Sequence, residues 1–311
     1  MTTALVTHDA AMHHVNPAGH PEQVARISHV LSALEGKDML RVRAPLAAED
    51  DLLRVHPRAH LEALRSAAPT EGFAQIDGDT FMSPGTLEAA TRAVGGAVQA
   101  VDMIIAEEVR NAFIAMRPPG HHAERETAMG FCYFGTVAAA VRHALNHHGL
   151  ERVAVVDFDV HHGNGTQDLL EEDARVFFAS SHQSPLFPGT GAADDTGPHG
   201  TVMNVPLSSG TAGQEFRQLW DREILPAVAA HDPEMIFISA GFDAHRDDPL
   251  ASLNLTEADF AWVTEAICEL ASTQCAGRVM SSLEGGYDLD ALGRSVAAHA
   301  DALISAGAKT G

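Results

Sequence analysis

Basic residues are scarce in this chain of 311 residues, which carries 20 Lys and Arg against 42 Asp and Glu and a net charge of −22. Proteins that bind nucleic acids need basic patches to neutralise the phosphates. We therefore expect no nucleic-acid partner. The same negative field favours cationic substrates over anionic ones.

Cysteine is also rare, and long apolar runs are missing. The three cysteines, Cys132, Cys268 and Cys275, show no Cys-x-x-Cys spacing, which argues against a disulfide framework and fits a reducing compartment. No apolar stretch is long enough to cross a bilayer, and the first residues lack a basic region followed by an apolar core. We expect a cytoplasmic protein without membrane contact. Neither a Gly-x-Gly-x-x-Gly nor a Walker-type motif is present to bind phosphate.

Short apolar runs alternate with amphipathic stretches along most of the chain. This alternation predicts an α/β fold with parallel strands and crossover helices on both faces. No repeat or Gly/Ser linker divides the sequence, so we expect a single domain over residues 1–311. The expected strands are Ala4–Val6, Ala112–Met116, Val153–Val156, Val176–Ala179, Val202–Val205, Met235–Ile238 and Val279–Leu283. The expected helices are Val24–Leu34, Leu87–Val109, Val137–His147, Phe216–Ala229, Phe260–Leu270 and Leu289–Leu303.

The most informative segment is 153–165, where an apolar strand runs directly into Asp157, Asp159 and His161. At a spacing of two residues, these side chains are predicted to share one face of the strand. The following Gly163-Asn164-Gly165 predicts a turn. Open α/β sheets bind ligands at this edge, beyond the carboxyl ends of their strands.

Three other strand ends carry reactive side chains to the same edge, in the segments 117–124, 240–249 and 284–288. Asp159, His161 and Asp243 form a set of two carboxylates and one imidazole that neutralises a divalent ion and leaves a position for water. Zinc fits these donors, and so does iron(II). Such an ion lowers the pKa of bound water to about 7 and polarises a carbonyl, as amide hydrolysis requires.

Proton transfer can be supplied by His121 or His122, which follow two stiffening prolines. A basic imidazole needs a partner on its other nitrogen, and Asp157 and Asn164 are the candidates. Tyr287 follows two glycines and can present its phenol to a developing oxyanion. The remaining histidine pairs are weaker candidates. His147 and His148 are interpreted as structural residues near the solvated end of a helix. His162 is expected to face away from the metal site, and His13 and His14 stay undecided.

Six segments between Thr3 and Leu303 resemble the histone deacetylase family of the arginase-deacetylase group, and they occur in that family's order. Arg117-Pro118-Pro119 and Glu124 are similar to the class II branch, which also covers bacterial amidohydrolases and acetylpolyamine hydrolases. The segments are R-P-P-G-H-H-A-E, G-F-C-Y-F, D-F-D-V-H-H-G-N-G-T-Q, F-P-G-T-G, A-G-F-D-A-H-R-D-D-P-L and L-E-G-G-Y-D-L. The resemblance implies a single-domain, three-layer fold with a mostly parallel sheet and the active site at the carboxyl ends of its strands.

The resemblance also implies a role for each matching position. Zinc is expected at Asp159, His161 and Asp243, with catalytic roles for His121, His122 and Tyr287 supported by Asp157 and Asn164. A narrow tunnel for the apolar stem of acyl-lysine is expected to be walled by two phenylalanines, and a structural potassium ion is expected near residues 157, 159, 161 and 180. The implied substrate-contacting residues are Gly130, Phe131, Phe187, Leu250 and Gly285, and the implied potassium ligands include Asp157 and Ser180.

Three positions depart from patterns found in many members. Asn164 replaces an aspartate of class I members, so the pKa of His122 is expected to be raised less. Gly135 replaces an asparagine, for which the sequence gives no reason. Leu250 stands at a gatekeeper position where a polyamine-preferring member has an acidic residue, and it favours substrates with an apolar stem.

The leading hypothesis is therefore a zinc-dependent deacylase that hydrolyses N-acyl amides of the acetyl-lysine type. An acetylpolyamine amidohydrolase and hydrolysis of another small-molecule amide remain alternatives. An arginase-like enzyme with two manganese ions is disfavoured because His245 stands where a second aspartate would be expected. A binding module that recognises acylated ligands without turnover would have lost Tyr287 or a metal ligand, and neither is lost. The sequence leaves open whether the chain forms a homo-oligomer.

Overall fold

The computed structural model describes residues 2–308, so the ends of the predicted 1–311 domain, Met1 and 309–311, lie outside the described residues. Its centre is an eight-stranded sheet in which every strand pair is parallel, in the order β2-β1-β5-β10-β9-β6-β7-β8. A separate antiparallel pair is formed by β3 and β4. The strands are β1 (Thr3–Thr7), β2 (Met39–Arg43), β3 (Ala74–Gln75), β4 (Phe81–Met82), β5 (Asn111–Ile114), β6 (Val153–Asp157), β7 (Val176–Gln183), β8 (Val202–Leu207), β9 (Ile236–Ala240) and β10 (Val279–Leu283).

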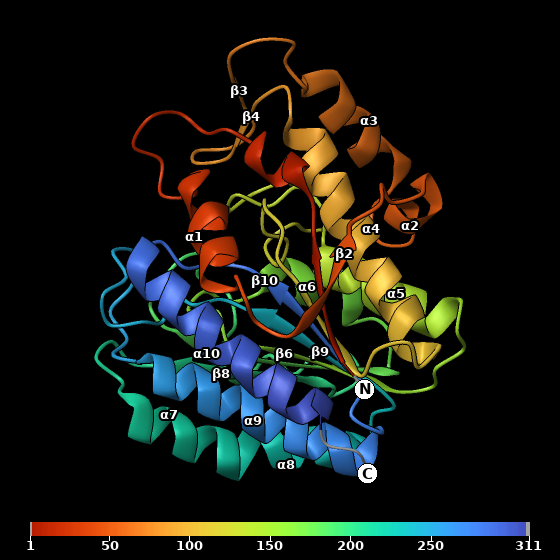
Figure 1. Ribbon diagram of the computed structural model, residues 1–311, viewed down its shortest axis with the longest axis vertical. Coiled ribbons are helices and arrows are strands. Elements are labelled where there is room, and N and C mark those ends of the chain that lie inside the picture. Colours follow the sequence, from red (N-terminus) through yellow and green to blue (C-terminus); the bar gives the residue numbers. More distant parts are fainter. Residues whose placement is uncertain (1, 309–311) are drawn as a thin grey trace.

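Helices cover both faces of the sheet, which confirms the predicted α/β architecture. The helices α7 to α10 lie on one side of the sheet, and α4 and α5 lie on the other (Figure 1). The helices are α1 (Ala25–Ala33), α2 (Glu49–Leu53), α3 (Arg58–Ala67), α4 (Thr86–Ile105), α5 (Thr136–Asn146), α6 (Asn164–Leu170), α7 (Gly213–Leu219), α8 (Leu225–His231), α9 (Glu257–Gln274) and α10 (Leu289–Ala308), with a 3₁₀ turn at Asp9–Met12 and a π-helical turn at Trp220–Ile224.

The four central strands, β5, β10, β9 and β6, are buried along their whole length. Strands that are covered on both faces are apolar throughout, and this is why the sequence shows continuous apolar runs there. Neighbouring parallel strands end at the same edge of the sheet. The loops that follow these four strands therefore meet at one place, and they carry the predicted zinc ligands, the tandem histidines and Tyr287.

The sequence patterns missed elements with weak apolar signals. Strand β2 lies at the edge of the sheet, has only five residues including two arginines, and buries only Met39 fully. The predicted helix at Phe216–Ala229 consists of α7 and α8 joined by the π-helical turn. Helix α9 begins earlier than predicted because Thr256 and Asp259 cap its N-terminus.

One local prediction was wrong. Strand β6 ends at Asp157, so Asp159 and His161 do not continue it. The carboxylates end the strand by accepting backbone N–H groups: that of Asp159 donates to Asp157, and that of His161 donates to Asp159. The predicted turn at Gly163-Asn164-Gly165 is instead the start of α6.

Within residues 2–308, none of the helices combines the length and the apolar character that a bilayer-spanning segment requires.

Candidate metal centre and active site

The three predicted metal ligands converge just beyond β6 and β9. The His161 Nδ1 atom lies 3.1 Å from Asp159 Oδ1 and 3.1 Å from Asp243 Oδ2. Both aspartates are fully buried, and His161 is 8% exposed. Backbone N–H groups of Val160 and Gly285 hold the outer carboxylate oxygens, at 2.9 Å from Asp243 Oδ1 and 2.8 Å from Asp159 Oδ2. The three inward ligand atoms can therefore share one cation.

The electrostatics of this group fit a divalent ion. Burial, followed by the charge of Asp159, raises the pKa of Asp243. Burial opposes the charge on His161, but hydrogen bonds to the two aspartates outweigh it and raise its pKa to about 10. The two buried carboxylates thus share the single positive charge of a protonated His161. A divalent cation would neutralise both of them. Two oxygens and one imidazole nitrogen are donors suited to zinc or iron(II).

The two tandem histidines have different partners. The His121 Nδ1 atom lies 3.0 Å from Asp157 Oδ2, whereas His122 Nδ1 lies 2.7 Å from Asn164 Oδ1. Their rings are tilted against each other with centroids 3.9 Å apart. The structure therefore gives each histidine one of the two partners that the sequence suggested.

These partners separate the protonation of the two rings. Burial opposes the charge on His121, but Asp159 and Asp157 outweigh it and raise its pKa to about 10. Burial, His121 and His161 together lower the pKa of His122 well below its ordinary value. The pKa of His122 is thus lowered rather than raised, because Asn164 offers no charge to oppose burial.

Glu284 is a buried carboxylate that the sequence patterns did not single out. Its Oε2 atom accepts the backbone N–H groups of Gly120 and His121 at 2.7 and 3.2 Å. Burial raises its pKa to about 7. The end of β10 thereby fixes the loop that carries the tandem histidines. Glu284 directly precedes Gly285-Gly286-Tyr287 in the sequence, and this position was the signal that could have identified it.

Tyr287 is held from both sides near the metal ligands. The backbone N–H of Tyr287 donates to Asp248 Oδ2 at 2.7 Å, and the guanidinium of Arg26 lies 4.8 Å from the centre of its ring. Its hydroxyl has no hydrogen-bond partner among residues 2–308. Burial raises its pKa well above the ordinary value, so the phenol stays a proton donor. This donor is available for a ligand.

A cavity of about 580 Å³ leads from the surface to these groups. Its lining includes the predicted Gly130, Phe131, Phe187, Leu250 and Tyr287, together with His122 and His161. Gly285 is not among the described residues that line it, because that glycine lies behind the ligands: a Cβ there would come within 2.0 Å of Asp243 Oδ2. The sequence analysis missed the outer part of the lining, which consists of Pro17, Ala18, Gly19, His20, Pro21, Gly78, Asp79, Phe81 and Leu186.

Comparison with known proteins agrees with the family resemblance of the sequence motifs. A sequence model of the histone deacetylase domain matches residues 20–303. The chain belongs to the histone deacetylase family. A histone deacetylase-like amidohydrolase of Pseudomonas aeruginosa is 39% identical over 279 residues, covering 87% of this chain and 73% of its own. Histone deacetylase 14, chloroplastic, of Arabidopsis thaliana is 39% identical over 319 residues, covering 95% of this chain and 75% of its own.

The fold of the family is also confirmed. The crystal structure of the HDA15 HD domain matches with a TM-score of 0.92 and 32% sequence identity, covering 98% of this chain and 90% of that one. As a member of the histone deacetylase family, the chain is a hydrolase of the deacetylase and amidohydrolase type.

The structure gives a reason for one departure from the family's pattern. A Cβ at Gly135 would lie 2.4 Å from Leu169 Cδ1, so the packing of α6 leaves no room for the asparagine expected at this position. The undecided His14 is structural: it is fully buried, and its Nδ1 lies 2.8 Å from Thr86 Oγ1. His162 faces Thr190 and Gln167 rather than the metal ligands, as expected.

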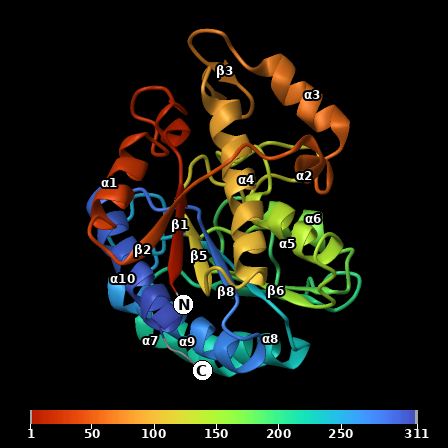
Figure 2. The same cartoon turned by 45° about the vertical axis from the view of Figure 1, so that its right-hand side comes forward.

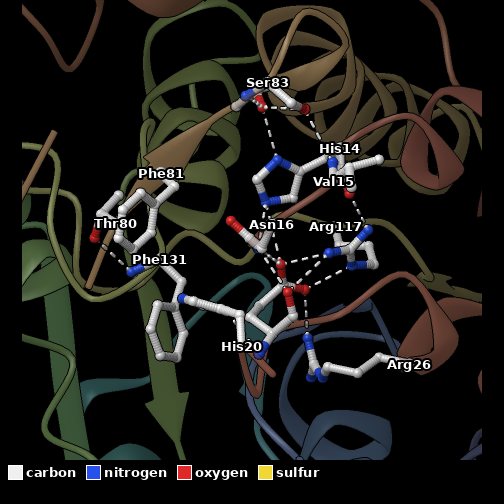
Figure 3. A network of polar contacts seen from close by, with 12 residues as sticks. His14, Val15, Asn16, His20, Arg26, Thr80, Phe81, Ser83, Arg117 and Phe131 are labelled. Carbon is white, nitrogen blue, oxygen red and sulfur yellow. Dashed lines mark hydrogen bonds and ion pairs between the residues drawn. The ribbon is translucent and has the colours of Figure 1, made fainter. Parts of the chain in front are cut away.

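A buried ion network, which the sequence analysis also missed, supports the candidate active site of this histone deacetylase family member from the N-terminal side (Figure 3). Glu22 binds Arg117 through two contacts, of 2.6 and 2.5 Å, and Arg26 at 3.1 Å. His14 and Asn16 also contact its carboxylate. Arg26 in turn donates to the backbone carbonyl of Gly286 at 2.6 Å. The network therefore links the N-terminal loop to the backbone that positions the phenol.

Replacing Glu22 with glutamine is expected to destabilise the fold by about 3–5 kcal/mol, because two buried guanidinium groups would lose their charge partner. Burial opposes ionisation of Glu22, but Arg117, His14 and Arg26 outweigh it and hold its pKa well below 4.5. A lowered pKa in the folded state stabilises the protein above pH 4.5 and loses this contribution as the pH falls. Urea unfolding should therefore show the largest difference from wild type near neutral pH.

A matched control for this variant is Glu49→Gln, which removes an exposed carboxylate that pairs with Arg58 and Arg65. It should leave the urea midpoint almost unchanged. Equal midpoints for the two variants would mean that the buried network does not stabilise the fold.

Proposed function

We propose that this protein is a zinc-dependent deacylase that hydrolyses N-acetyl and related acyl amides at the end of an apolar stem, as in acetyl-lysine. One observation carries the proposal: the cavity ends at His122, His161 and Tyr287, beside two fully buried carboxylates that can complete a metal site. When bound, the ion supplies Lewis acidity, which polarises the substrate carbonyl and makes water a nucleophile near neutral pH.

Proton transfer is assigned to His122, which lines the cavity. The Asn164 Nδ2 atom donates to Glu124 Oε1 at 2.7 Å, which turns Asn164 Oδ1 toward His122 Nδ1. The N–H of His122 is then on Nδ1, and the free lone pair is on Nε2. That nitrogen can accept a proton from the attacking water and return it to the leaving amine.

Oxyanion stabilisation is assigned to Tyr287. The carbonyl oxygen of the substrate gains negative charge as the amide becomes tetrahedral, and a donor fixed in place beforehand stabilises that charge. The contacts of Tyr287 with Arg26 and Asp248 fix its ring and backbone before substrate binds.

The walls of the cavity favour an apolar stem. Phe131 contacts the ring of Tyr287 edge-on at 5.8 Å, and Phe187 packs edge-on against His122 at 5.1 Å. Leu250 is half-buried at the same cavity. The aliphatic chain of acetyl-lysine fits such walls, and its peptide backbone would stay at the rim. One observation favours the alternative acetylpolyamine substrate, because Asp79 is an anionic group in the lining that could bind a distal ammonium.

The first experiment is to measure release of free amine from acetyl-lysine peptides and acetylpolyamines in parallel, with zinc-loaded protein. Faster turnover of the peptides supports the proposed substrate class, and faster turnover of acetylpolyamines supports the alternative. A hydroxamate that binds without turnover of either class would favour another acyl group or a binding module.

Substitution of Leu250 by glutamate is expected to raise the ratio of kcat/KM for acetylpolyamines over acetyl-lysine peptides about fivefold. One added charge near the cavity is worth about 1 kcal/mol toward a cation in a solvated environment. Leu250→Gln, which adds polarity without charge, is the matched control. An equal shift in both variants would show that loss of the apolar wall, rather than charge, changes the preference.

A structural potassium ion is proposed beside the catalytic metal. Asp157 is fully buried, and it lies directly opposite Ser180 in the pairing of β6 with β7. This brings a buried carboxylate and a hydroxyl to the same level of the sheet, a donor set suited to a hard cation. Exchange of potassium for a large organic cation should lower the melting temperature. The cytoplasmic location stays a prediction.

A further inference from the structure

A second group of metal-binding side chains lies where α5 ends against α4. It consists of Asp102 on α4 and of His143, His147 and His148 at the end of α5. Each offers a ligand atom within 4.8 Å of the others. The two helices run side by side in both views (Figures 1 and 2). His143 and His147 are one helical turn apart, so their rings emerge on the same face of the chain.

The ligand atoms already point at one another. The Nε2 atoms of His143 and His148 lie 2.6 and 2.7 Å from the same oxygen, Asp102 Oδ1. The rings of His143 and His147 are stacked with centroids 4.7 Å apart. Zinc bonds of about 2.0–2.1 Å place tetrahedral ligand atoms about 3.3 Å apart. Opening the two contacts between Asp102 and the histidines to this spacing needs a shift of about 0.6 Å, which the Asp102 side chain, 49% exposed, is free to make.

The hydrogen bonds to Asp102 account for only two of the three histidines in this group. Asp102 can tie the two helices together through His143 and His148, and such a tie does not use His147. The His147 side chain is exposed and has ring contacts with the other two histidines, but no hydrogen bond or ion pair within residues 2–308. Burial lowers the pKa of His143, which favours the neutral imidazole that binds metals.

This group is separate from the catalytic centre. Helix α5 starts at Thr136, close to the loop of the tandem histidines, and ends at Asn146, just before the start of β6. The group therefore lies at the opposite edge of the sheet from the carboxyl ends of the strands. An ion bound here would join α4 to α5 and would not contact the substrate.

We propose that Asp102, His143, His147 and His148 bind one divalent transition-metal ion. Three imidazoles and one carboxylate favour zinc, nickel or copper(II) over magnesium or calcium. The site does not depend on the proposed deacylase function. Its bound ion stabilises the fold by linking two helices.

The test uses metal-free full-length protein titrated with zinc and measured by calorimetry and by metal analysis after dialysis. Wild type should bind two equivalents, and Asp243→Ala should bind one, at the helix site. Adding His147→Ala to Asp243→Ala should weaken that remaining site at least about tenfold, since even indirect supports of a metal ligand contribute 10–100-fold. Without metal, the two proteins should melt at the same temperature.

Two further variants separate a ligand role from a structural one. Asp102→Asn keeps an oxygen that accepts hydrogen bonds from the imidazoles but removes the charge, so it should also weaken zinc binding. His199→Ala removes an exposed histidine elsewhere and should leave zinc binding unchanged. The proposal is overturned if Asp243→Ala binds no zinc, or if His147→Ala leaves its zinc affinity and its melting temperature in zinc unaltered.

Discussion

Replacing Tyr287 with phenylalanine is expected to lower kcat about 10²–10³-fold while metal content and the affinity for a hydroxamate change little. The variant loses only a hydroxyl, and loss of one oxyanion donor from a preorganised site typically reduces kcat by this factor. The ring would keep its contacts with Arg26 and Phe131. Steady-state kinetics on an acetyl-lysine substrate, with KM recorded separately, measures the effect.

The second tyrosine of the chain provides a matched control. The hydroxyl of Tyr133 donates to the backbone carbonyl of Phe81 and is not among the described groups that line the cavity. Tyr133→Phe removes the same atom and should cost about 1 kcal/mol of stability with little change in kcat. If Tyr287→Phe keeps more than about a tenth of the wild-type kcat, another group must stabilise the oxyanion.

Replacing Asp243 with alanine is expected to remove the catalytic metal and reduce turnover to background. The variant loses one of three ligands, and it leaves the backbone N–H of Val160 without its buried acceptor. Metal analysis should find one equivalent fewer than in wild type. Added zinc should not restore activity.

Asp248→Asn is the control for this loss. Asp248 is a buried carboxylate that accepts the backbone N–H groups of Tyr287 and Leu250, and it is not part of the ligand group. Asparagine keeps an oxygen acceptor, so the variant should retain the metal. Wild-type metal content in Asp243→Ala would show that the ion is bound elsewhere.

Sequence analysis could predict those features that follow from the order of the motifs along the chain. Four strand ends carry polar motifs directly after apolar runs, and parallel pairing brings these ends together regardless of the detailed packing. The group formed by Asp159, His161 and Asp243 could therefore be predicted, although Asp243 is 82 residues from His161.

Contacts without a local pattern could not be predicted. Glu22 meets Arg117 95 residues away, and Arg26 meets Gly286 260 residues away. In the sequence, Glu22 before helix α1 and Arg26 within it are only charged positions among others. The end of β6 was missed for a different reason. The Asp157 side chain accepts the backbone N–H of Asp159, and hydrophobic periodicity carries no information about such bonds.

The hydrogen bonds between Arg26 and the loop after β10 have a consequence for folding during synthesis of the chain. Arg26 is fully buried, and its guanidinium is bound to the carbonyls of Glu284 and Gly286. A ribosome adds those residues 258 and 260 positions after Arg26. Until then the Arg26 guanidinium lacks two of its backbone acceptors, and a cation without its hydrogen-bond partners resists burial. The catalytic rim should consequently become protected only after Glu284 and Gly286 have been synthesised.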